Sequence, residues 1–243
     1  MKFSMKAMIL AAGRGERLRP LTLTTPKPIL PVGGVPIIHR TITLLKKYGF
    51  NDIVINLHHL GEQIERSLGD GSTFGVNIKY SWEKELLGTG GGIKAAQHLL
   101  GNEPFLVVNS DILIDINLLD LVNFHRHTRA AATLVVRDDP TLPGHGAIKI
   151  DDKHRIRDIL GLVDIDNSGN YYRRLFVGVQ VLEAIFFDYC EPDRWLSSTQ
   201  DIFPRMLKDG LALYAYEHKG FFADIGTLST YQKYLNMPTL SNL

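Results

Sequence analysis

The chain has 243 residues, of which 44% are hydrophobic and 22% are charged, so it can form a well-packed core of ordinary globular composition. Its 27 basic and 26 acidic side chains leave a formal net charge of +1, which excludes a global attraction to nucleic acid or to a membrane surface. Cys190 is the single cysteine, which excludes an intrachain disulfide, and no run approaches the ~20 apolar residues of a membrane span. We expect a cytoplasmic protein with no nucleic-acid or membrane partner, and a homo-oligomer is compatible with this composition.

In the first half of the chain, apolar runs of strand length alternate with segments of helical periodicity. The predicted strands are Met5–Ala11, Asp52–Leu57, Val76–Ser81, Phe105–Asn109 and Ala131–Arg137. The predicted helices are Pro36–Tyr48, Leu60–Leu68, Gly91–Leu100 and Ile116–Arg129. Continuous Val/Ile/Leu runs are typical of strands buried on both faces, so this alternation predicts a parallel, doubly wound sheet.

The second half has a different pattern. Ala147–Ile150 and Arg155–Leu160 alternate polar and apolar residues as antiparallel strands do, and Phe176–Leu182 is another predicted strand. Asp201–Asp209 and Thr227–Asn236 are predicted helices. The expected fold is therefore an α/β, Rossmann-like, doubly wound sheet, mixed but mainly parallel, with a small antiparallel cap.

The segment Met8–Pro28 is a strand followed by a loop rich in cations. The cations are Arg14, Arg17, Arg19 and Lys27. Gly13 and Gly15 let backbone approach a phosphate closely, and arginine can clamp phosphate oxygens in pairs. Neither the P-loop nor the dinucleotide glycine spacing is present, so the glycines alone also fit a surface turn with solvated charges.

Acidic residues follow two further strands. Asp111 comes after Phe105–Asn109, and Asp224 ends the short apolar run that begins at Phe222. Ligands of open α/β sheets bind outside the carboxyl ends of the strands, where two such carboxylates can share a Mg²⁺ ion with phosphates. The alternative for Asp111 is that it starts a turn or caps the helix that begins near Ile116. The alternative for Asp224 is helix capping, for which Thr227 is the better candidate.

Four glycines occupy five positions in Gly88–Gly92, directly before a predicted helix. We interpret this run as bare backbone against which a flat base or a phosphate can lie, with a helix N-terminus beyond it. Glu83 can accept hydrogen bonds from a base N–H, or it is a solvated surface charge. Trp82 and Trp195 are expected to be packing residues, and no zinc spacing or covalent nucleophile is found.

Together these residues resemble the sugar-1-phosphate nucleotidylyltransferases, and the resemblance runs from Met5 to about Tyr234. The motifs that carry it are Ala12-Gly13-Arg14-Gly15-Glu16-Arg17-Leu18-Arg19-Pro20-Leu21-Thr22, Thr25-Pro26-Lys27-Pro28, Leu87-Gly88-Thr89, Ser110-Asp111 and Phe222–Thr227. It implies one nucleotidyltransferase domain over 1–243, with a nucleotide-binding half over about 5–135 and a sugar-binding half, the cap, over about 136–243.

The resemblance also implies roles. Arg17 would bind the triphosphate, Lys27 would lie between the two reacting phosphates, and Asp111 and Asp224 would hold Mg²⁺; Arg17, Lys27 and Asp111 are the implied catalytic residues. The implied nucleotide-binding residues are Leu10, Ala11, Ala12, Gly13, Gly15, Glu83, Gly88 and Thr89. The implied sugar-binding residues are Asn109, Gly146, Val177 and Gly178.

The implied reaction joins a nucleoside triphosphate, GTP or UTP, to a sugar 1-phosphate and releases pyrophosphate. In its compact length and local sequence, the chain most resembles a short bacterial branch of the family, which includes N-acetylmuramate-1-phosphate uridylyltransferases and mannose- or heptose-1-phosphate guanylyltransferases. One departure is that Ile159–Leu162 lacks the lysine that many members carry in the comparable stretch. A non-catalytic regulatory subunit of the same fold and a nucleotide-sugar glycosyltransferase are the alternatives.

Overall fold

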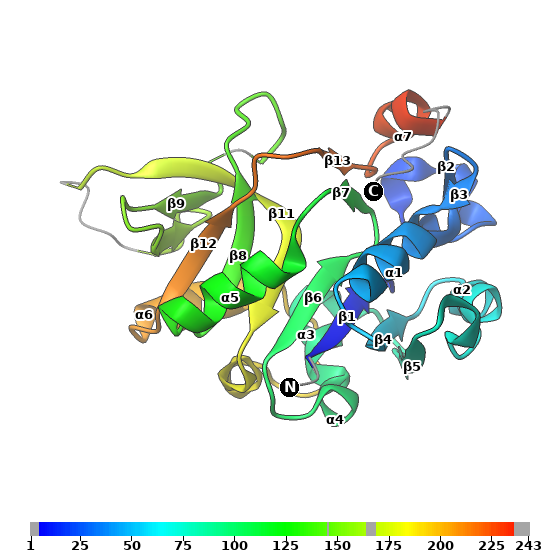
Figure 1. Cartoon of the computed structure of the whole chain (residues 1–243), viewed down its shortest axis with the longest axis horizontal. Coiled ribbons are helices and arrows are strands. Elements are labelled where there is room, and N and C mark those ends of the chain that lie inside the picture. Colours follow the sequence, from blue (N-terminus) through cyan, green and yellow to red (C-terminus); the bar gives the residue numbers. More distant parts are fainter. Residues whose placement is uncertain (1–4, 145, 164–168, 236–243) are drawn as a thin grey trace.

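A nine-stranded mixed sheet forms the centre of the computed structural model, which describes residues 5–144, 146–163 and 169–235 (Figure 1). The strand order is β10-β9-β11-β6-β1-β4-β5, while β8 pairs with β11 and β12 pairs with β8. The strands are β1 (Lys6–Leu10), β4 (Asp52–Leu57), β5 (Asn77–Trp82), β6 (Phe105–Asn109), β8 (Ala132–Arg137), β9 (Ile148–Ile150), β10 (Ile156–Ile159), β11 (Tyr172–Leu182) and β12 (Leu213–Glu217).

The strands β6, β1, β4 and β5 are parallel neighbours, as the Val/Ile/Leu runs predict. Leu10, the last residue of β1, is in register with Asn56 on β4 and with Asn109 on β6. The carboxyl ends of these three strands therefore meet at one edge of the sheet.

The second half of the chain joins this sheet through β11. This long strand is antiparallel to β6 on one side and to β8 on the other, and its first residues pair with β9. Because β11 lies between β6 and β8, the two halves share one continuous sheet. The prediction of a mixed α/β fold is confirmed.

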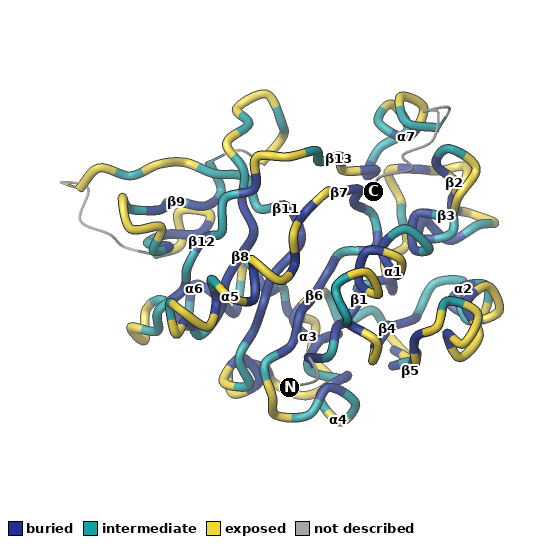
Figure 2. Tube along the Cα trace, in the orientation of Figure 1, coloured by how far each residue is buried: buried dark blue, intermediate teal, exposed yellow. Residues whose placement is uncertain are grey.

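Helices cover both faces of the sheet. Apolar side chains of α1 (Ile37–Lys47), α2 (Gly61–Leu68) and α5 (Leu118–Thr128) fill one core, and those of α3 (Gly88–Ala95), α4 (Gln97–Leu100) and α6 (Phe203–Lys208) fill the other. In α1, Ile38, Ile42 and Leu45 recur every three or four residues, so they form one stripe that is fully buried. Figure 2 shows the central strands dark blue and the exposed positions on the outer helices and loops.

Two small sheets shape the edge where the strands end. β2 (Pro31–Val32) pairs with β3 (Val35–Pro36), and β7 (Ile112–Ile114) pairs with β13 (Phe222–Asp224), which is followed by α7 (Leu228–Leu235). The β7–β13 pair brings the C-terminal part of the chain beside the loop that follows β6. No helix in the described ranges is long and apolar enough to cross a membrane.

Some predicted boundaries differ from the structure. The helix predicted at Gly91–Leu100 begins at Gly88 and is divided between α3 and α4 at Ala96. The strand predicted at Phe176–Leu182 begins earlier, at Tyr172, and the helix predicted at Asp201–Asp209 is a π-helical turn followed by α6. The strands β7 and β12 were not predicted from the sequence, and Asn236 of the predicted last helix lies outside the described residues.

Candidate functional site

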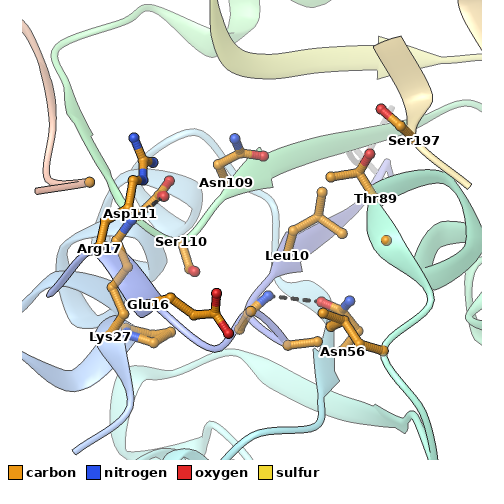
Figure 3. Close-up of a pocket in the computed structure, with 18 of the residues that line it drawn as sticks. Leu10, Glu16, Arg17, Lys27, Asn56, Thr89, Asn109, Ser110, Asp111 and Ser197 are labelled. Carbon is orange, nitrogen blue, oxygen red and sulfur yellow. Dashed lines mark hydrogen bonds and ion pairs between the residues drawn. The ribbon is translucent and has the colours of Figure 1, made fainter. Parts of the chain in front are cut away.

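A cavity of about 560 Å³ lies outside the carboxyl ends of β1, β4 and β6, where open α/β sheets bind ligands (Figure 3). Eleven of the site residues implied by the sequence line it: Leu10, Ala11, Ala12, Gly13, Gly15, Arg17, Lys27, Gly88, Thr89, Asn109 and Asp111. Glu83, Gly146, Val177, Gly178 and Asp224 are not part of this lining.

The charged end of the cavity is built from the loop after β1 and the loop after β6. Lys27 Nζ forms an ion pair with Asp111 Oδ2, and the lysine side chain is 10% exposed. The arginine of this loop is close to Asp224, because a Cβ added at Gly226 would lie 2.8 Å from Arg17 Nη2 and 2.7 Å from Asp224 Oδ1. Two cations and two carboxylates therefore converge here.

The β7–β13 pairing holds the two carboxylates near one another. Asp224 is in register with Ile112, and Ile225 N donates to the carbonyl oxygen of Asp111 at 2.9 Å. Partial burial, and then the negative charge of Asp111, raise the pKa of Asp224, while Lys27 and Arg17 act in the opposite direction. An acidic pair of this kind is stabilised by a bound cation.

The donor set fits Mg²⁺ that is shared with a substrate. Within the described ranges, no group of three or more His, Cys, Asp or Glu side chains could form a complete metal cage. Mg²⁺ typically uses one or two protein carboxylates and completes its shell with substrate phosphates and waters. Asp111 and Asp224 are such a pair.

Helix capping does not account for these aspartates. Asn117 caps α5, since its Oδ1 accepts from Leu119 N at 3.0 Å and from Asp120 N at 3.3 Å. At the start of α7, Thr227 Oγ1 accepts from Thr230 N at 3.2 Å. The capping interpretation of Asp111 is therefore wrong, and Thr227 takes the cap before α7 as expected.

A buried hydrogen-bond chain fixes the backbone at the floor of the cavity. Ala11 N donates to Asn56 Oδ1 at 2.8 Å, Asn56 Nδ2 donates to Glu83 Oε1 at 2.7 Å, and Leu87 N donates to Glu83 Oε2 at 2.9 Å. This chain, which we call the Asn56–Glu83 bridge, links the ends of β1, β4 and β5 to the start of α3.

Glu83 differs from both sequence interpretations. It is 5% exposed, so it is not a solvated surface charge, and both carboxylate oxygens already accept from the protein. Burial raises the pKa of Glu83, and the hydrogen bonds from Leu87 and Asn56 partly offset this effect. Its side chain supports the cavity floor from behind.

The glycine run serves packing within the chain. Gly90 N and Gly91 N donate to the carbonyl oxygen of Leu196 at 2.8 and 3.3 Å, so these two amides at the start of α3 are not open to an anion. A Cβ added at Gly91 would lie 2.3 Å from Arg194 O, and one at Gly92 would lie 2.6 Å from Glu83 Oε1. The close approach that these glycines permit is to residues 194–198 and to the Asn56–Glu83 bridge.

The expected sugar-binding residues are distributed unevenly. Asn109 lines the cavity, and Gly178 lies against it: a Cβ at Gly178, where φ is +81°, would lie 2.5 Å from Asn109 Nδ2. Val177 is 2% exposed and packs in the core, so its side chain does not reach the cavity. Gly146 has φ +89° and lies beside Arg173.

Sequence reasoning missed several residues of the lining. Asn56 is the next-to-last residue of the buried strand β4, close to the sheet edge that Asn109 marks on β6, so a polar side chain at this point of an apolar run was a usable signal. Trp195 and Ser197 come from an irregular segment of the second half, and Gln200 comes from the π-helical turn Ser198–Ile202 that follows it; no local pattern pointed to these residues. Trp195 is 56% exposed and lines the cavity, so the expectation that it is a packing residue is wrong.

The chain is similar to known proteins over most of its length. Residues 6–237 match the family model described as nucleotidyl transferase. A Neisseria meningitidis N-acetylmuramate alpha-1-phosphate uridylyltransferase is 62% identical over 114 residues, which are 46% of this chain and 49% of that protein. A Mycobacterium tuberculosis mannose-1-phosphate guanylyltransferase is 33% identical over 224 residues, which are 91% of this chain and 61% of that protein.

The fold is also that of a solved structure. The crystal structure of HddC from Yersinia pseudotuberculosis with GMP-PN has a TM-score of 0.79 to this chain at 22% identity, covering 95% of this chain and 98% of that one. By contrast, the chain spans about half to three fifths of the length of the two curated relatives.

Proposed function

The chain belongs to the nucleotidyl transferase family, and on that premise we propose that it transfers a nucleoside monophosphate from a nucleoside triphosphate to a sugar 1-phosphate. A phosphate oxygen of the sugar 1-phosphate attacks the α-phosphorus in line, and the bond from that phosphorus to the pyrophosphate breaks. The products are a nucleoside diphosphate sugar and pyrophosphate.

One observation carries this proposal. Lys27, Arg17 and Asp111 line one end of the cavity, with Asp224 beside them next to Gly226, while the other end is lined by the neutral residues Gly88 and Thr89. Two polyanions must come within about 3 Å of one another, and catalysis of phosphoryl transfer is mainly positioning and neutralisation of charge. The sugar phosphate is largely ionised at neutral pH, with a second pKa of about 6, so no general base is needed.

Each of these four residues would have a separate role in the reaction. Arg17 extends from the exposed loop and would stabilise charge on the departing pyrophosphate. Lys27 is held beside Asp111 and would lie between the sugar phosphate and the α-phosphate. Asp111 and Asp224 would hold Mg²⁺, which would neutralise charge on the phosphates when bound.

We propose UTP with N-acetylmuramate 1-phosphate as the first substrate pair to test. The 62% identity to the Neisseria enzyme over 114 residues supports it. GTP with mannose 1-phosphate is the second pair, supported by the longer match to the guanylyltransferase at 33% identity.

The test is pyrophosphate release with Mg²⁺, each of four nucleoside triphosphates and a panel of sugar 1-phosphates. We expect turnover with at least one pair. The variant D111N should lose that turnover and keep the wild-type fold by circular dichroism. If no pair supports turnover, the proposed reaction is wrong, and if D111N remains active, the metal role of Asp111 is wrong.

A further inference from the structure

Trp195 is a large aromatic side chain on the cavity wall that the phosphate-binding motifs do not explain. Indole is usually well covered by protein, yet Trp195 is 56% exposed, and it lines the same cavity as Gly88 and Thr89. We propose that the indole of Trp195 stacks on the nucleobase of the bound triphosphate. This assignment rests on the proposed transferase function.

The indole lies beside the start of α3. A Cβ added at Gly88 would lie 3.2 Å from Trp195 Cε2, so the ring packs against bare glycine backbone. On the next residue, Leu196 N donates to Leu87 O at 2.9 Å and Leu196 O accepts from Gly90 N at 2.8 Å. These bonds hold the backbone next to Trp195 in place, so this segment loses little conformational entropy when a base binds.

The distribution of charge indicates which part of a nucleotide lies there. Figure 3 shows Arg17, Lys27 and Asp111 at one side of the cavity and Thr89 and Ser197 at the other, with Leu10 between them. The phosphates are drawn to the cations and the metal-binding carboxylates. The base is then left at the neutral end, where the exposed indole of Trp195 is also part of the wall.

Stacking of this kind adds affinity without choosing one base. Every base has a flat π-face that an aromatic ring can cover, whereas identity is read by hydrogen bonds at the base edge. Trp195 therefore contributes to binding of both pyrimidine and purine nucleotides, and the polar groups nearby, such as Ser197 and Gln200, are left to distinguish them.

Fluorescence can isolate this residue, because the chain has two tryptophans. Trp82 is the matched control: it is 48% exposed, lies against Gly61 and is not part of the cavity lining. With UTP or GTP and Mg²⁺ and no sugar phosphate, the emission of W82F, which retains Trp195, should be quenched. The emission of W195F should stay constant while the nucleotide binds. Unchanged emission of W82F at saturating nucleotide would overturn the proposal.

Affinity for a ligand without a base separates stacking from a general structural role. W195A should weaken binding of UTP and GTP about 5- to 150-fold, the range found when a stacking aromatic is replaced by alanine. Its affinity for inorganic tripolyphosphate should change less than about twofold, W195F should retain most of the nucleotide affinity, and W82A should change neither ligand. An equal loss for tripolyphosphate, or no loss for the nucleotides, would refute stacking.

Failure of the proposed reaction gives a different result. If wild type releases pyrophosphate but W195A keeps full nucleotide affinity, stacking is wrong and the reaction stands. If W195A shows the base-dependent loss but no substrate pair supports turnover, stacking stands and the reaction is wrong.

Discussion

Replacing Glu83 with glutamine tests whether the Asn56–Glu83 bridge holds the cavity floor. Each carboxylate oxygen of Glu83 accepts one hydrogen bond, from Asn56 Nδ2 at 2.7 Å and from Leu87 N at 2.9 Å. Glutamine offers one oxygen, so its NH₂ must face one of these two donors. A flip of the Asn56 amide does not remove the mismatch of two donors, because Asn56 Nδ2 would then face another donor, Ala11 N.

The cost of E83Q follows from this mismatch. A buried donor without a partner costs about 1–3 kcal/mol. Burial raises the pKa of Glu83, which means that its buried negative charge is itself destabilising. Removing that charge offsets part of the cost of the unpaired donor, so we expect E83Q to lower the free energy of unfolding by about 1–2 kcal/mol. For a chain of this length that corresponds to a fall of roughly 2–8 °C in Tm.

The assay is thermal unfolding combined with nucleotide KM. Because Ala11 N is tied to this bridge, E83Q should raise KM for the nucleoside triphosphate more than KM for the sugar 1-phosphate. The control is E85Q, the same chemical change at an exposed position two residues away. If E83Q matches E85Q in both Tm and KM, the Asn56–Glu83 bridge does not support the cavity floor.

Two other substitutions give distinct expectations. G92A adds a Cβ 2.6 Å from Glu83 Oε1 and 2.8 Å from Asn56 Nδ2, so it should lower the free energy of unfolding by about 1–3 kcal/mol. The control G13A, whose added Cβ has nothing within 4 Å, should leave stability unchanged. Equal melting temperatures for the two variants would show that Gly92 is not required for packing. D224N should raise Tm at pH 7 in EDTA, because partial burial and Asp111 raise the pKa of Asp224, and the ionised carboxylate then costs stability. The gain in Tm of D224N over wild type should shrink as pH falls below the raised pKa, because wild-type Asp224 is then itself protonated. A gain in Tm that grows on acidification would contradict this prediction.

The strand-end residues were predictable because the strand itself determines where they lie. A continuous apolar run predicts a strand buried on both faces, and its first polar residue marks the sheet edge, as Asn109 and the following Asp111 show. The cations of the loop after β1 follow the same logic, since Arg17 and Lys27 belong to the segment that follows Lys6–Leu10 and line the cavity. In these cases local sequence carries the three-dimensional information.

Glu83 and the glycine run show where local sequence is insufficient. A carboxylate and a stretch of bare backbone near a nucleotide motif look like ligand contacts, because the chain supplies no visible partner nearby in sequence. In the structure the partners are Asn56, 27 residues earlier, and residues 194–198, about a hundred residues later. The direction of a polar side chain is decided by such distant partners, and one sequence does not reveal them.

The insertion of β11 between β6 and β8 explains why these distant partners are available. The sheet order brings the second half directly against β6, so Gly178 lies beside Asn109, and residues 194–198 pack on the start of α3. The cavity wall at the neutral end is therefore an interface between the two halves of the chain, and its composition can vary without altering the strand-end cations and acids. Differences in base and sugar preference within one fold would then arise at residues such as Ser197 and Gln200, whereas the charged end, which any pair of phosphates requires, stays the same.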